Sequence, residues 1–99
     1  TKAIEYVNKV RTRARGTALP TVVPNLPSTL SGQPLLDAIY HERRVELAGE
    51  GFRFHDLVRT GRAGALLSPY GFVEGKHELM PLPVDQVALS EGVLIQNNY

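Results

Sequence analysis

Apolar residues recur at helical spacing near the start of the chain. Val7, Val10 and Ala14 are separated by three and then four residues, so they share one stripe of an α-helix. Gly16 follows as a typical residue for a helix end. The pattern predicts an amphipathic helix over residues 2–15.

The next part of the chain breaks this pattern. Residues 17–33 contain Pro20, Pro24 and Pro27, and no helix persists through prolines at that spacing. We expect an extended connection that is longer than most loops in compact domains. Such a loop either has a function of its own or packs against another part of the protein, and the sequence does not choose between these.

The remaining segments predict an all-α chain with long irregular loops. Gly49 and Gly51 each cost about 1 kcal/mol relative to alanine in a helix interior, so a break is expected between them. Residues 70–99 are rich in glycine and proline and are expected to be mostly irregular. Four further helical segments are predicted, at residues 34–48, 52–62, 65–67 and 84–89.

Charged residues lie among apolar ones in the predicted central helices. Apolar residues such as Tyr40 and Val45 fall on opposite sides, which is typical of a helix enclosed by other structure. Enclosed charges need partners, and the spacing of three residues offers them. The expected structural charge network consists of Arg43, Glu46, Glu50, Arg53 and Asp56. The alternative is a solvated surface ladder worth about 0.3 kcal/mol per pair, which we expect for Glu42 and Arg59.

Composition excludes several classes of function. The net charge is +1 and there is no cysteine, so neither a nucleic-acid partner nor a thiolate site is expected. Arg11, Arg13 and Arg15 alternate in sequence and therefore point in different directions on a helix, which is not a basic patch. The chain begins at Thr1 with its apolar periodicity already established, which predicts a piece cut from a longer protein.

No catalytic, metal-binding or cofactor-binding motif is complete. His41 begins like a zinc-protease motif, but Val45 stands where the second histidine is needed. Glu46 and Glu50 are four residues apart and would share a helix face, as acid and base pairs do, but nearby arginines favour structural neutralisation. In the loop that follows, Tyr70 and Phe72 suit contact with a sugar ring, although anchoring the loop is the more common role.

Four stretches in order resemble the C-terminal region of SusD/RagB proteins. Residues 6–14 are similar to the family's "YVN-VR-RA" helix, and residues 42–59 resemble its signature helix. Residues 75–83 look like its "GKH-L-PIP" stretch, and residues 96–99 look like its "QNPGY" ending. The chain departs from the family at three positions, which are Gly49, Thr60 and Asn98.

The resemblance implies an architecture and a role. SusD/RagB proteins are lipid-anchored, outward-facing proteins of the bacterial outer membrane, found in Bacteroidetes-type bacteria. They bind oligosaccharides or peptides and cover a SusC-type TonB-dependent transporter, and their fold is a tetratricopeptide-like helical superhelix. We therefore expect residues 1–99 to be the C-terminal segment of such a non-catalytic protein, with no cofactor and no ligand residue transferable from the family. The alternatives are a carbohydrate-active enzyme fragment using Glu46 and Glu50, and a free-standing helical interaction module.

Overall fold

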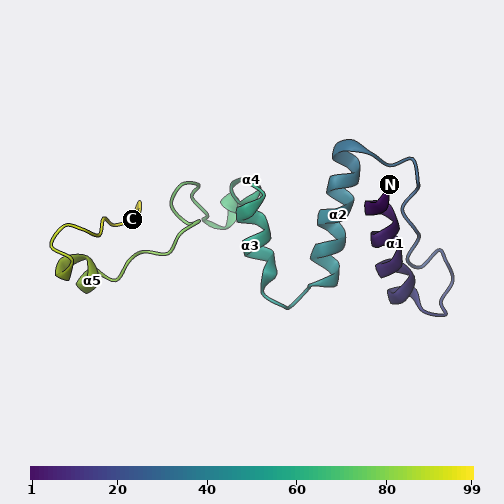
Figure 1. Cartoon of the computed structure of the whole chain (residues 1–99), viewed down its shortest axis with the longest axis horizontal. Coiled ribbons are helices and arrows are strands. Elements are labelled where there is room, and N and C mark those ends of the chain that lie inside the picture. The colour runs from purple at the N-terminus through teal and green to yellow at the C-terminus, as the bar shows by residue number, and fades with distance from the viewer. The chain divides into compact units, whose positions relative to one another are not determined.

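The computed structural model describes all residues from 1 to 99 and contains helices but no strands (Figure 1). The expected all-α class with long irregular loops is confirmed. The chain divides into two compact units, residues 1–50 and 51–99. No helix combines the length and the apolar character needed to cross a bilayer.

The first unit is a pair of helices, α1 (Lys2–Arg15) and α2 (Gly32–Glu46), which lie side by side (Figure 1). The bounds of α1 agree with the prediction at both ends. Arg11 contacts Glu42, and Arg13, further along α1, contacts Glu46, further along α2. Because contacts advance along both helices together, the two helices run parallel.

The long connection runs back along α1 and is packed against it. Asn8 forms two hydrogen bonds with the backbone of Leu26, and Arg15 donates one of 2.8 Å to the carbonyl of Val23. The later of these two α1 residues therefore contacts the earlier of the two connection residues, as expected for a segment that runs back along the helix. Packing against the protein, one of the two roles left open for this loop, is what the structure shows.

The predicted break after α2 is confirmed, with an earlier end to the helix. The helix stops at Glu46, two residues before the predicted end, and a turn carries the chain through Gly49 and Gly51. These glycines have φ angles of 82° and 79°, in the left-handed region that residues with a Cβ adopt only at a cost. The conformational freedom of glycine at these two positions therefore allows the turn that separates α2 from the next helix.

The second unit contains α3 (Phe52–Arg59), α4 (Ala63–Leu67), the 3-10 helix η1 (Ser68–Tyr70) and α5 (Val84–Leu89). Its small core holds Leu57, 2% exposed, and Ala63, 3% exposed.

The predicted end of α3 at residue 62 is wrong by three residues. The N–H of Gly61 bonds the carbonyl of Val58, and the N–H of Arg62 bonds that of Leu57. These two bonds form a Schellman motif around Gly61 in the left-handed conformation, which closes the helix.

Candidate functional site

An ion pair ties the two helices of the first unit together. Arg11 Nε lies 2.7 Å from Glu42 Oε2, and the two side chains are 14% and 16% exposed. Arg11 also donates a hydrogen bond of 2.8 Å to the carbonyl of Pro24, so it joins both helices to the connection. The expectation that Glu42 belongs to a solvated ladder is wrong, because its partner comes from another helix and covers it.

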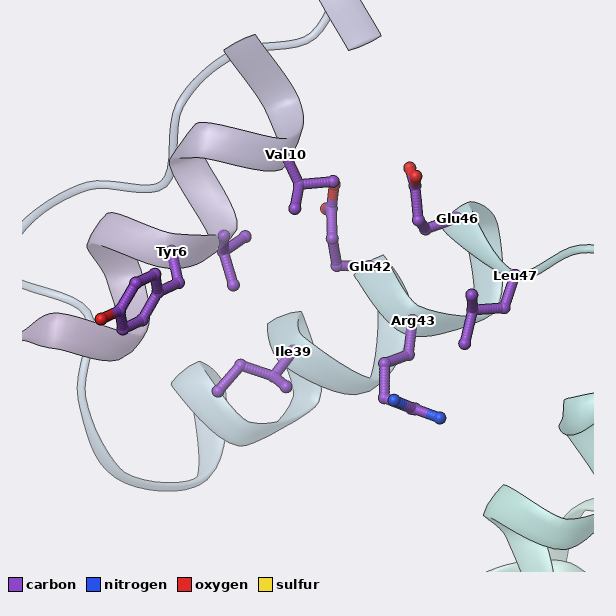
Figure 2. A pocket seen from close by; sticks show the side chains of 8 residues that line it. Tyr6, Val10, Ile39, Glu42, Arg43, Glu46 and Leu47 are labelled. Atoms are coloured by element: carbon purple, nitrogen blue, oxygen red, sulfur yellow. The ribbon is translucent and has the colours of Figure 1, made fainter. Parts of the chain in front are cut away.

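Beside this ion pair lies an open groove between α1 and α2, with a volume of about 250 Å³ (Figure 2). Its lining is mostly apolar. Figure 2 shows Glu42 and Glu46 extending from α2 toward α1, whereas Arg43 projects from α2 in another direction. The residues that line the groove are Tyr6, Val7, Val10, Ile39, Glu42, Arg43, Glu46 and Leu47.

The five residues of the expected charge network occupy three different settings. Arg43 is half-buried in α2, and Glu46 at the end of that helix pairs with Arg13 of α1. Glu50 is exposed in the turn that follows. In α3, Arg53 is half-buried and Asp56 is buried.

Asp56 has a partner in its own helix. Both Nε and Nη2 of Arg59 lie 2.8 Å from its Oδ1 atom. The side chain of Arg59 is 55% exposed, which agrees with the solvated position expected for it. A buried carboxylate is thus tied to the surface of α3 by a cation three residues away, as the spacing predicted.

The end of α2 determines how Glu46 and Glu50 lie relative to each other. Because the helix stops at Glu46, Glu46 and Glu50 do not share the helix face on which the acid and base alternative was based. Glu50 lies in the turn before α3, and Arg53 lies in the first turn of that helix. No group of three or more His, Asp or Glu side chains is placed to hold a metal ion.

Aromatic and imidazole rings organise the second unit. Phe72 contacts Phe54 and His77 edge-to-face, with ring centroids 6.2 Å and 5.7 Å away. His77 Nδ1 accepts a hydrogen bond of 2.9 Å from the N–H of Val73, so the neutral ring carries its proton on Nε2. Phe72 therefore anchors its loop, whereas Tyr70 is 85% exposed.

Residues 96–99 clamp the loop at residues 75–82 through side-chain bonds to its backbone. Gln96 accepts from the N–H of Leu82 and donates to its carbonyl, both at 2.8 Å. The next three residues each donate to one further carbonyl. These bonds run from Asn97 to Met80 at 2.6 Å, from Asn98 to Gly75 at 3.0 Å and from Tyr99 to Leu79 at 2.6 Å.

Sequence reasoning noted both of these segments but did not predict that they meet. The available signal was a run of side chains able to hydrogen-bond, following an extended segment with two prolines and no strand partner. Such a segment has backbone groups that need partners, and amide side chains can supply both a donor and an acceptor.

Comparison with known proteins gives one consistent result. A family model described as the SusD family matches residues 1–91. SusD-like protein P38 of Formosa agariphila is 38% identical over 83% of this chain, and SusD-like protein P25 of the same organism is 31% identical over 93%. The chain spans 16% and 18% of the lengths of these curated relatives. No solved structure matches significantly.

Proposed function

Because this chain belongs to the SusD family, we propose that it is part of a protein that captures a glycan or other nutrient and releases it chemically unchanged. The observation that carries this proposal is the family match over residues 1–91. The structure supports a scaffold role, since three carboxylates, those of Glu42, Glu46 and Asp56, are committed to ion pairs with arginines.

We also propose that residues 1–99 are the C-terminal segment of a longer polypeptide. The chain exposes 7496 Å², whereas two separate compact bodies of half its mass would together expose about 6,700 Å². Its buried apolar side chains are those of Ile4, Leu57 and Ala63. So much uncovered surface is expected where other helices of the same protein pack, including over the groove beside α1 and α2.

The five charged residues are proposed to act together in that longer protein. Covering the exposed faces would move Glu50 and the half-buried Arg43 and Arg53 further from water. Desolvated charges require close partners, and these residues carry both signs. In the full-length protein, Arg43→Met is expected to lower the unfolding free energy by about 3 kcal/mol, as for a broken buried pair. A loss below about 0.5 kcal/mol would instead support the solvated ladder.

Location and partner are proposed from the family alone. The full-length protein would be lipid-anchored at the outer surface of the outer membrane and would cover a SusC-type TonB-dependent transporter. Copurification from detergent-solubilised membranes tests this directly. An outer-membrane TonB-dependent barrel should be recovered in about equal amount with the tagged protein, and its absence under mild detergent would contradict the partnership.

Ligand capture is tested by binding to the full-length protein. Affinity electrophoresis against a panel of polysaccharides, with peptides tested in parallel by calorimetry, should reveal at least one retained ligand. We expect a glycan, because that is the role the family supports. Retention of no glycan and no peptide would contradict the proposal.

A further inference from the structure

The second unit contains a pocket of about 500 Å³ between α3 and the loop at residues 75–82. Phe54, His55, Val58 and Arg59 of α3 form one wall, and Val58 and Phe54 share a helix face because they are four residues apart. Residues 77–80 form the other wall. A volume of this size lies within the range of small-molecule sites.

The loop wall is held in place before any ligand arrives. The four clamp residues, Gln96 to Tyr99, bond backbone atoms at both ends of the loop at residues 75–82 and within the wall. Two further bonds hold the loop. The N–H of Gly75 donates to Glu78 Oε1 at 3.0 Å, and the N–H of Val73, just before the loop, donates to His77 Nδ1. An irregular loop with this many bonds needs little ordering on binding, which favours affinity.

One atom in this wall lacks a partner. Glu78 Oε2 is buried and has no hydrogen bond, although Oε1 of the same carboxylate is bonded. Unsatisfied buried acceptors are rare in folded proteins and require an explanation. Glu78 itself is one of the residues that line the pocket, so a carboxylate with an unused acceptor lies in its wall.

The remaining groups determine the class of ligand. Phe54 and Met80 are exposed and give apolar surface. Arg59 donates its Nε–H to Asp56 and places Nη2 2.8 Å from the same oxygen, and its other N–H groups can donate to a ligand acceptor. His77 carries an Nε2 proton. The pocket thus combines apolar walls with donors and an unsatisfied acceptor.

From this combination we propose that the pocket is a subsite for a neutral sugar ring, an inference that rests on the proposed glycan-binding function. A sugar ring has apolar C–H faces and hydroxyls that both donate and accept. An ammonium group could only donate and would face the Arg59 guanidinium. An anion would meet a guanidinium already neutralised by Asp56 and would lie close to the Glu78 carboxylate.

The experiment uses the full-length protein and calorimetry with neutral gluco- and galacto-oligosaccharides, an oligogalacturonate and a lysine-rich peptide. Phe54→Leu removes the ring surface, and Glu78→Gln replaces the free acceptor by a donor while Oε1 still receives the Gly75 bond. Phe52→Leu, on the same helix, and Glu74→Gln, on the preceding turn, are matched controls outside the pocket. Both pocket variants should weaken binding of the neutral oligosaccharide at least tenfold, with the controls within twofold.

A second readout reports on the pocket itself. Saturating oligosaccharide should slow amide exchange in residues 75–82 in the unmodified protein and in the two controls. If the pocket variants bind the neutral glycan as tightly as the unmodified protein, and the glycan does not protect this loop, the subsite is refuted. The proposed function would remain intact. Weakening confined to the acidic glycan or the peptide would overturn the ligand class. Absence of any glycan binding would overturn both the subsite and the function on which it rests.

Discussion

The ion pair between Arg11 and Glu42 makes a quantitative prediction about the first unit. Exposed ion pairs contribute about 0–1 kcal/mol, whereas breaking a buried one costs about 3–5 kcal/mol. With side chains 14% and 16% exposed, this pair lies near the buried limit. Arg11→Met also removes the bond to the Pro24 carbonyl. We therefore expect the local opening free energy of α1 and α2 to fall by about 2–3 kcal/mol.

Native-state hydrogen exchange on the full-length protein measures this change locally. A loss of 2–3 kcal/mol corresponds to exchange about 30- to 150-fold faster, reported by the amide of Leu26 and by those in the last turn of α2. Lys9→Met is the matched control, because its ion pair with Glu5 is solvent-exposed. That control should change exchange by about twofold or less.

A double variant separates the ion pair from general damage. Replacing both partners of a polar contact by apolar groups avoids leaving one of them unsatisfied. Arg11→Met combined with Glu42→Leu should therefore recover part of the loss. Exchange in Arg11→Met no faster than in Lys9→Met would refute the interpretation that this pair joins the helices.

Three further changes test other contacts of the fold. Asn8→Ala should accelerate exchange of the Leu26 amide about 30-fold, because two bonds of about 1 kcal/mol each are lost, and an equal rate in both proteins would contradict the packing of the connection on α1. Gly49→Ala should lower the denaturant-derived unfolding free energy by about 1 kcal/mol, since φ is 82°; unchanged stability would show that the turn tolerates a side chain. Gln96→Ala should accelerate exchange of the Leu82 amide at least tenfold, with the exposed Gln86→Ala as control. Equal effects of these two variants would argue against the clamp.

Features determined by short stretches of sequence were predictable. The bounds of α1 and α5 agree with the prediction, because the apolar period, Gly16 and Pro83 mark them locally. The break after α2 was predicted from two glycines. Helix ends were displaced by two or three residues where a turn took over the last backbone bonds, as at Gly61.

Contacts between distant residues could not be read from periodicity. Arg11 and Glu42 are 31 positions apart, and the parallel course of α1 and α2 depends on how the connection returns along α1. Helical spacing offered Glu42 only neighbours on its own helix, which is why it was wrongly expected in water. The meeting of Gln96 with Leu82 likewise follows from the path of an irregular segment. The family resemblance identified these stretches without indicating which of them touch.

We propose that the acidic residues of this chain support a scaffold, and that the full-length protein binds a nutrient without converting it. The most direct measurement is to incubate the full-length protein with each glycan that it binds and to analyse the recovered sugar by mass spectrometry. We predict that the glycan is recovered intact, with Glu46→Gln and Glu50→Gln leaving this result unchanged. Cleavage by the unmodified protein that either substitution abolishes would contradict the account.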